Sequence, residues 1–332
     1  MKKKFIFSDV VNLTLKEIMN TNKNVILFGL GIDDPKGIFG TTKGLDKIYG
    51  KKRVFDMPTS ENAMTGVAIG MSLNKIIPIM THQRMDFFLL AMDQLVNNAA
   101  KWKFMFGGLK NTPIIIRLIV GRGWGQGPTH SQNFQNMFAN IPGLKIHVPS
   151  FPSSMREILF SSLTSKDPVL IIEHRWLHNI SENIDFKTKP KKFKSVKKIK
   201  SGKDLTIISS SYSTFEIMKL YKFIDEKNIS IDHIDVNSIK PFDFKLILKS
   251  VKKTRKLLIL DNSVHEYCSF GSYLISKLVS EDNNIFVKKP INLSLPDIPS
   301  PTSFHLTKNY YYSSRDIVNK IGFLLGKKLS YP

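Results

Sequence analysis

Four polar side chains follow short apolar runs in the sequence, each after a turn or a loop. These side chains are Glu61, Gln83, His130 and His174. Carboxyl, amide and imidazole groups can bind a cofactor or move a proton. If the apolar runs are parallel strands, their carboxyl ends meet at one edge of a sheet, which is where ligands bind in such folds. The four residues together therefore indicate a site better than any one of them alone.

His130 lies in the glycine-rich stretch GRGWGQGPTHS, which covers residues 121–131. A dinucleotide-binding loop needs the spacing GxGxxG, and a P-loop needs Lys and then Ser or Thr after its last glycine. This stretch has the spacing GxGxGxG followed by Pro128 and Thr129, so it matches neither motif. We expect a loop that leads from a strand to a helix at residues 131–140, with His130 at the helix start. A structural and a functional role for this histidine both stay open.

Glu61 follows Pro58 and Thr59, which turn the chain after a strand-like run. At the start of the next helix it is either a first-turn acid that the helix dipole stabilises, or a partly buried carboxyl group able to share a proton. Phe87, after Gln83, is either an ordinary core residue or an aromatic wall for a flat ligand. Position alone does not decide between these interpretations.

Strand-like and helix-like segments alternate along the chain, which indicates α/β layers with mostly parallel sheets. The run at residues 114–120 has the unbroken apolar character of a strand covered on both faces. Pro78 indicates an edge or an irregularity in the strand at 76–80. We expect helices from their apolar spacing. Those of the first half are residues 9–21, 86–101, 131–140 and 153–164, with another beginning at 61.

The composition changes after residue 180, where a polar, lysine-rich stretch begins. We expect a cofactor domain at residues 1–180, a linker at 181–203 and a smaller α/β domain at 204–332. In the second domain the expected strands are 205–209, 231–236 and 256–260. The expected helices are 214–226, 242–251, 273–279 and 314–325.

The chain has 332 residues with a formal net charge of +22. This charge admits a nucleic-acid-binding protein as an alternative. The lysines are spread along the whole chain without a nucleic-acid motif, so we expect no nucleic-acid partner. The single cysteine, Cys268, excludes an internal disulfide and a cysteine-based metal cluster within these residues. No run of about 18 apolar residues is present, and the apolar start ends at Phe7, so we expect a cytoplasmic protein without a membrane span.

In their order, these motifs resemble the beta subunit of the thiamine-diphosphate-dependent component of 2-oxoacid dehydrogenases, of the pyruvate, branched-chain or acetoin type. The resemblance covers most of residues 5–180 and continues more weakly to the end. The matching stretches are residues 58–61, Gln83 with 86–87, 93–101, 107–108, 121–132, 142–145, 167–168 and 173–174. The resemblance implies a doubly wound domain of the transketolase pyrimidine-binding type, followed by a smaller domain of the transketolase C-terminal type.

The resemblance also implies roles for particular residues. The glutamate that matches Glu61 hydrogen-bonds the aminopyrimidine ring of thiamine diphosphate and promotes proton loss from the thiazolium carbon. The cofactor then acts as electron sink for decarboxylation. Phe87 would line the pyrimidine ring, with Gln83 and Thr59 also in the cofactor site. The histidine that matches His130 would lie near the substrate and assist transfer of the acyl group to lipoyl-lysine.

A partner subunit is implied as well. The thiamine-diphosphate signature, GDG with a downstream Asn-Asn pair, does not occur in residues 1–332. In the family, the alpha subunit holds the diphosphate and Mg²⁺, and the site is shared between chains. The resemblance therefore implies an α2β2 heterotetramer that is active only with the alpha subunit. A lipoyl acyltransferase core would be a further partner, and a structural K⁺ is a further candidate ion.

Some positions depart from the family pattern, namely His82, Arg84, Thr129 and the stretch 261–266. They leave the identity of the 2-oxoacid open. They also keep an alternative in the same enzyme class, in which the chain is half of a split transketolase or of a thiamine-dependent carboligase acting on a sugar-like compound.

Overall fold

The computed structural model describes residues 2–123, 125–261 and 267–331. The chain forms two compact units. The first contains Met1–Gly121 and Phe138–Phe193, and the second contains Arg122–Met137 and Lys194–Pro332. Of the departing stretch at 261–266, residues 262–266 lie outside the described residues. Because the second unit includes Arg122–Met137, the glycine-rich stretch belongs to it from Arg122 onward.

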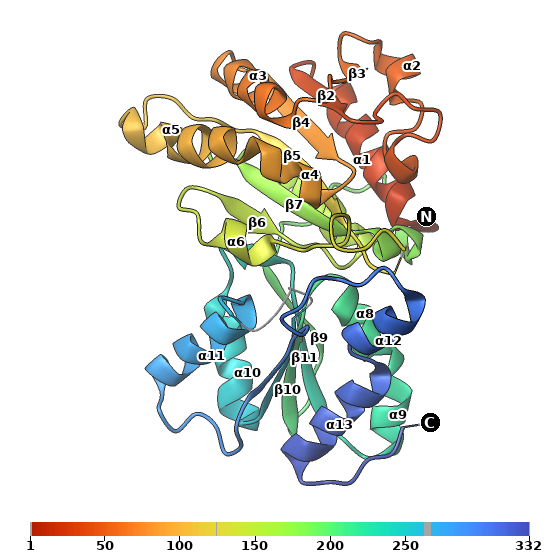
Figure 1. The fold of residues 1–332 in the computed structure, drawn as a ribbon, viewed down its shortest axis with the longest axis vertical. Coiled ribbons are helices and arrows are strands. Elements are labelled where there is room, and N and C mark those ends of the chain that lie inside the picture. The colour runs from red at the N-terminus through yellow and green to blue at the C-terminus, as the bar shows by residue number, and fades with distance from the viewer. Residues whose placement is uncertain (1, 124, 262–266, 332) are drawn as a thin grey trace. The chain divides into compact units, whose positions relative to one another are not determined.

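The first unit contains six strands that pair in the order β6-β7-β5-β4-β2-β3 (Figure 1). Every pairing among them is parallel. Their bounds are β2 Val25–Gly29, β3 Val54–Asp56, β4 Ile77–His82, β5 Ile115–Val120, β6 Lys145–His147 and β7 Val169–His174. Strands β5 and β7 are buried at every residue, which confirms the expected parallel α/β sheet.

Helices connect these strands. They are α1 Phe7–Thr21, α2 Leu45–Tyr49, α3 Glu61–Leu73, α4 Met85–Phe88, α5 Ala100–Met105, α6 Gln135–Ala139 and α7 Pro152–Ser162. Short 3-10 helices are η1 Ile38–Gly40, η2 Leu89–Ala91 and η4 Arg175–Asn179. Helix α1 packs against α7, and α3 packs against β4. A separate antiparallel pair joins β1 Lys3–Ile6 to β8 Ser181–Ile184.

Of the two alternatives for Pro78, an edge or an irregularity, the structure excludes the edge. Strand β4 lies between β2 and β5. Its pairing with β5 begins at Ile79, one residue after the proline, whereas Pro78 itself is in register only with Ile26 of β2. A proline that precedes the paired stretch removes no hydrogen bond from that ladder.

The single long helix expected at residues 86–101 is interrupted in the structure. A 3-10 turn follows α4, and a π-helical segment, η3 Gln94–Ala99, precedes α5. Two carbonyl groups in this region meet other parts of the chain. The hydroxyl of Thr112 donates to the carbonyl of Ala99 at 2.8 Å, and Gly143 lies directly against the carbonyl of Ala100. Carbonyl groups with such outside contacts accompany a change of helical hydrogen bonding.

The helix expected at residues 131–140 is shorter than predicted. Helix α6 begins at Gln135, whose backbone N–H donates to the side chain of Asn133 at 3.1 Å. Such a turn at an asparagine competes with helix formation before it. His130 therefore lies in the loop before α6 and not at a helix start.

The second unit contains a five-stranded sheet in the order β14-β13-β10-β11-β9, in which only β9 is antiparallel to its neighbour. The strands of this sheet are β9 Val196–Lys200, β10 Leu205–Ser209, β11 Ile231–Val236, β13 Leu257–Leu260 and β14 Ile291–Leu293. A further strand of the unit, β12 Ser238–Lys240, is not part of this sheet. The helices are α8 Tyr212–Lys219, α9 Tyr221–Glu226, α10 Phe244–Thr254, α11 Phe270–Glu281, α12 Phe304–Tyr310 and α13 Ser314–Leu325. Helix α13 has the predicted bounds, and a capping box of Ser313 and Asp316 begins it.

The lysine-rich stretch at 181–203, expected to be a linker, carries strands at both of its ends, β8 and β9. The lysines of β9 have acidic partners. Lys198 lies 2.9 Å from the buried carboxylate of Asp232, and Lys200 lies 2.6 Å from Asp225. The lysine content that indicated a linker therefore belongs partly to a paired strand at a sheet edge, where lysine is favoured.

No described helix is both long enough and apolar enough to cross a membrane.

A fully buried ion pair joins β5 to β7 in the centre of the first sheet. Arg117 binds both carboxylate oxygens of Glu173, with Nε–Oε1 and Nη2–Oε2 distances of 2.6 and 2.9 Å. Burial would raise the pKa of Glu173, but the Arg117 guanidinium and contact with His178 lower that pKa to about 2. Glu173 is therefore ionised across the neutral pH range and the pair satisfies both buried charges.

Glu173→Gln should lower the free energy of unfolding by about 3–5 kcal/mol, because Arg117 would remain buried without its carboxylate. Chemical denaturation of the purified chain measures this loss. The double variant Arg117→Met with Glu173→Met serves as control and should recover most of the stability, since neither charge remains. A single variant as stable as the double variant would contradict the account.

Candidate functional site

The carboxyl ends of β2, β3 and β4 are joined by side-chain contacts to one loop. The carboxylate of Asp56, the last residue of β3, accepts hydrogen bonds from the backbone N–H groups of Gly31 and Ile32, at 3.1 and 2.5 Å. The side-chain amide of Gln83, directly after β4, donates to the carbonyl of Leu30 at 3.1 Å. The loop after β2 is thus held from two sides at the edge where sequence analysis placed the site.

Gly31 allows this arrangement. Its φ is +77°, a left-handed conformation that side chains disfavour. A Cβ atom there would also overlap the Nε2 atom of Gln83. The amide of Gln83 therefore rests on the loop backbone only because residue 31 has no side chain.

Glu61 begins α3, five residues after Asp56, as the sequence predicted. The residue is only 4% exposed. Among the described residues, its backbone carbonyl accepts from Thr65 at 2.8 Å, but no hydrogen bond or ion pair reaches its carboxylate. The carboxylate oxygens themselves are not fully buried, so the group can be reached by a ligand at the start of α3.

Phe87 and Thr59 are exposed residues near this edge. Phe87 is 37% exposed, whereas its neighbour Phe88 is fully buried and packs against the ring of His82. The core role of the pair thus belongs to Phe88, and Phe87 is the partly exposed member. Thr59 is exposed in the turn before α3.

His82 and His174, which follow strands of the first unit or end them, both have contacts within the chain. His82 is buried beside the sulfur of Met80, at 2.8 Å from Nε2 to Sδ, and burial lowers its pKa to about 3. His174 accepts a hydrogen bond at Nδ1 from the backbone N–H of Trp176, at 3.2 Å, and so caps η4. The structure therefore assigns His174 a capping contact rather than a free imidazole.

The glycine-rich loop is anchored within the second unit. Arg122 forms an ion pair with Glu216 of α8, and its guanidinium lies over the rings of Tyr212 and Tyr311, at 5.5 and 4.7 Å. Burial raises the pKa of Glu216, and the charge of Arg122 opposes this shift. Gly127 has a φ of +66° and lies directly against Thr302. The glycines thus allow a close approach of the loop backbone to its own unit.

His130 lies near the end of this loop and is partly buried. Its Nδ1 atom lies 2.9 Å from the hydroxyl of Thr129, the residue that departs from the family pattern. A hydroxyl at this distance can fix the tautomer of the imidazole ring. The structure thus groups Gln83 with the loop after β2 in the first unit, and places His130 in the second.

Comparisons with known proteins agree with this architecture. The pyrimidine-binding domain of transketolase matches residues 3–179, and the C-terminal domain of transketolase matches residues 194–317. The chain is 30% identical over 329 residues to the pyruvate dehydrogenase E1 component subunit beta of Mesostigma viride, covering 99% of this chain and 100% of that protein. The chain belongs to the beta-subunit family of thiamine-diphosphate-dependent 2-oxoacid dehydrogenases.

Two further similarities concern a second relative and a solved structure. The acetoin:2,6-dichlorophenolindophenol oxidoreductase subunit beta of Bacillus subtilis (strain 168) is 30% identical, over 96% of this chain and 97% of that protein. A solved structure titled as a split gene transketolase, an inactive beta4 tetramer, has a TM-score of 0.78 at 19% identity. It covers 98% of this chain and 100% of its own. The predicted fold class and family are confirmed, and this last likeness shows the fold alone.

The described residues of the chain contain no group of three or more His, Cys, Asp or Glu side chains able to hold a metal ion. The exposed thiol of Cys268 stands apart from the residues of the candidate site in sequence. The side-chain contacts that hold the loop after β2 come from the carboxylate of Asp56 and the amide of Gln83.

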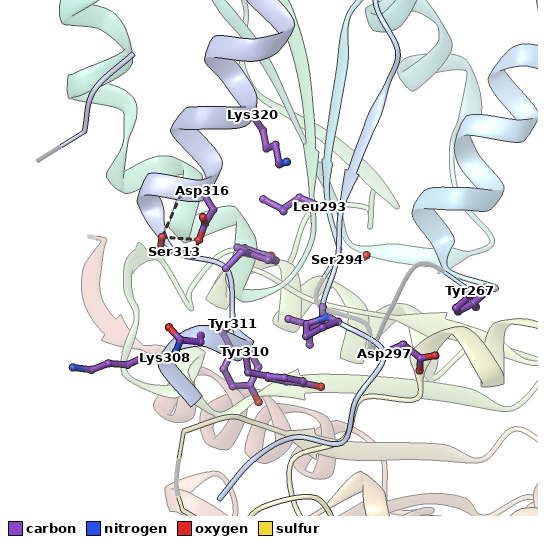
Figure 2. Close-up of a pocket in the computed structure, with 14 residues that line it drawn as sticks. Tyr267, Leu293, Ser294, Asp297, Lys308, Tyr310, Tyr311, Ser313, Asp316 and Lys320 are labelled. Carbon is purple, nitrogen blue, oxygen red and sulfur yellow. Dashed lines mark hydrogen bonds between the residues drawn. The ribbon is translucent and has the colours of Figure 1, made fainter. Parts of the chain in front are cut away.

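The second unit also contains a pocket of about 830 Å³, lined by tyrosines and by Lys308, Asp316 and Lys320 (Figure 2). Asp316 is engaged with Ser313 at the start of α13, at 2.7 Å between carboxylate and hydroxyl. The rings of Tyr310 and Tyr311 meet edge to face at 4.8 Å. Helix capping and ring packing account for these lining groups, and none of them is a residue that the sequence singled out.

Sequence analysis missed the role of Asp56 and Gly31. A signal was present, because an aspartate ends one strand while a Gly-Leu-Gly stretch ends another. What the sequence did not show is that β3 pairs directly with β2, which brings the two ends together. Arg117 was missed too, although an arginine inside a buried strand requires a carboxylate partner.

Gly31→Ala should destabilise the chain more than Gly44→Ala. Both glycines have positive φ, at +77° and +73°, so each substitution costs about 1–2 kcal/mol of backbone strain. Only the Cβ at position 31 also displaces Gln83, since nothing lies within 4 Å of the Cβ at position 44. Denaturation of both variants measures the difference, and equal losses would show that Gln83 does not depend on Gly31.

Proposed function

We propose that the chain acts on a short 2-oxoacid such as pyruvate and is active only together with an alpha subunit. Its relatives at 30% identity are named as beta subunits of pyruvate dehydrogenase and of an acetoin oxidoreductase. The observation that carries the proposal is the carboxylate of Glu61, which no described residue hydrogen-bonds although the residue as a whole is only 4% exposed. Such a carboxylate could bind a ligand that presents a ring nitrogen at the N-terminal end of α3.

When bound, thiamine diphosphate supplies an electron sink for the decarboxylation. In this proposal the carboxyl of Glu61 binds a nitrogen of the aminopyrimidine ring and holds a proton there. The exposed ring of Phe87 lies against the pyrimidine, and Gln83 and Thr59 line the same site. Gln83 fits this role because its contact with Leu30 fixes the side chain at the sheet edge.

The alpha subunit supplies the diphosphate-binding half of the site and Mg²⁺ in this proposal, with an α2β2 assembly. Residues 1–332 lack the GDG signature that would do this in one chain. Apolar side chains available for a subunit contact gather at the end of α5 and just after it. They are Phe104, Met105, Phe106 and Leu109, with exposed fractions of 91%, 52%, 48% and 87%. A structural K⁺ stays a prediction.

We further propose that the acyl group passes to lipoyl-lysine of an acyltransferase core. The net charge of +22 supports docking of an acidic segment of that core on lysines of the second unit. The alternative is half of a split transketolase or carboligase. The two hypotheses differ in their donor, because the first consumes a 2-oxoacid and the second a ketose.

Glu61→Gln in the complex with the alpha-like partner should abolish turnover of 2-oxoacids, because the amide cannot accept and hold the proton that the carboxyl group holds. The assay uses a panel of 2-oxoacids and an artificial electron acceptor. Glu157→Gln, at a second buried glutamate in α7, is the matched control. Near-wild-type rates for Glu61→Gln would remove this residue from the mechanism, and activity of the chain alone would refute the need for an alpha subunit.

His130→Ala should reduce transfer of the acyl group to a lipoyl acceptor by about 100-fold, the size of a typical acid–base contribution. Cofactor affinity should change much less, because no cofactor contact is assigned to His130. Rapid-quench measurement of acyl transfer, with titration of thiamine diphosphate alongside, separates the two effects. An unchanged transfer rate would return His130 to a structural role.

A further inference from the structure

The loop that carries His130 is attached to its own unit on both sides of this histidine. Before the histidine, Gly127 lies directly against Thr302. After it, the side chain of Asn136 accepts a hydrogen bond from the first backbone N–H of α11, at 3.1 Å. Both contacts lie within the second unit. The stretch between them is short, so these two contacts limit where the imidazole of His130 can lie.

At the start of the loop, the side chain of Arg122 is held by two kinds of contact. Its guanidinium forms an ion pair with Glu216 of α8, and both side chains are largely buried, at 9% and 12% exposed. The same guanidinium lies over the ring of Tyr311, which follows α12, at 4.7 Å from the ring centre. Water screens a buried pair less than a surface pair, so this contact holds the loop more firmly than an exposed ion pair would.

One segment of the second unit, residues 300–311, provides two of these contacts. Thr302, near its start, lies against Gly127, and Tyr311, at its end, lies against Arg122. The hydroxyl groups of the first and last residues of the segment lie 3.2 Å apart, which brings its two ends together. The loop therefore contacts one continuous piece of the second unit at Arg122 and again at Gly127.

A buried ion pair is a costly way to hold a loop. Both charges lose their hydration, and two apolar side chains in the same place would often be as stable. A guanidinium and a carboxylate meet in few geometries, so such a pair favours one arrangement of the backbone that carries it. The loop needs this help at Gly125, whose φ is +73° and whose Cβ position has nothing within 4 Å. The pair thus suits the placing of the loop better than the stability of the fold.

We propose that Arg122 and Glu216 are positioning residues for His130. Their ion pair fixes the start of the glycine-rich loop, and the fixed loop holds the imidazole in one place for transfer of the acyl group. Neither residue is assigned a contact with substrate or cofactor. This inference rests on the proposed function, because it takes His130 to act in acyl transfer.

Variants of the pair should slow acyl transfer in the complex with the alpha-like partner. Glu216→Gln and Arg122→Met should each lower kcat for transfer to a lipoyl acceptor about 10- to 100-fold, because small displacements of a reacting group have effects of this size. The KM for the acceptor should stay nearly unchanged. Arg122→Lys keeps a positive charge over the ring of Tyr311 and should recover part of the loss. Asp232→Asn, at another buried carboxylate of the second unit that is paired with a lysine, is the matched control and should leave transfer unchanged.

The same variants in a His130→Ala background show whether the pair acts through the histidine. Arg122→Met should cause no further loss of transfer there, since the group that it positions is absent. Equal losses with and without His130 would overturn the inference, because the pair would then act on the second unit as a whole.

A double variant separates the position of the loop from the stability of the fold. Arg122→Met with Glu216→Met leaves no buried charge unpaired, so the free energy of unfolding should recover most of the loss seen in Arg122→Met. Acyl transfer should nevertheless stay slow, because two apolar side chains do not fix the loop in one arrangement. Recovery of both stability and transfer would make the pair a structural contact only and overturn the inference.

Hydrogen exchange distinguishes a failure of this inference from a failure of the proposed function. The backbone N–H of His130 lies 3.4 Å from the carbonyl of Gly127, and mass spectrometry of the complex can follow its exchange. Exchange should be at least about tenfold faster in Arg122→Met, because the loop opens more often. Faster exchange together with wild-type transfer in His130→Ala would support the positioning of this histidine by the pair, and would refute its proposed role in acyl transfer. Unchanged exchange in both Arg122→Met and Glu216→Gln would overturn the inference.

Discussion

The candidate site of the first unit depends on one constraint, the parallel pairing of all six of its sheet strands. Parallel strands end at the same edge, so residues far apart in the sequence become neighbours there. Asp56 and Gln83 come from different strands and hold the same loop after β2. The buried pair of Arg117 and Glu173 ties β5 to β7 within the same sheet. The parallel pairing of the strands therefore brings the polar residues that follow them to the same edge of the sheet.

On this edge, Glu61 differs from the other acidic residues. Asp56 is held by backbone N–H groups and Glu173 by a guanidinium, so each carboxylate has its partner within the chain. The carboxylate of Glu61 has none among the described residues, although the residue as a whole is only 4% exposed. Its oxygens are not fully buried, so a ligand or a second subunit could bind them without breaking a contact within the chain.

Much of this fold could be predicted because the apolar runs are strong signals. The unbroken run at 114–120 indicated the buried parallel strand β5, and the turn before Glu61 indicated the start of α3. The errors arose where tertiary contacts override local pattern. Asn133 delays α6, and within the stretch expected as a linker Lys198 and Lys200 lie on strand β9 and are paired with Asp232 and Asp225.

The site residues were harder to foresee than the elements. Glu61 and Gln83 each follow a predicted strand within a few residues, and so their common edge followed from the topology. The support of Gln83 by Gly31 and the contact of Asp56 with the same loop depend on which strands are neighbours. Strand order is not encoded in any local stretch, and therefore only the structure shows these contacts.

The central claim is that the carboxyl group of Glu61 acts on the aminopyrimidine ring of thiamine diphosphate. The most direct measurement is the rate at which the thiazolium C2 proton of the cofactor exchanges with deuterated water in the assembled complex, without substrate. The account predicts that Glu61→Gln slows this exchange by at least about 100-fold, the size of a typical acid–base contribution, while the cofactor still binds. Exchange as fast as in the wild-type complex would contradict it.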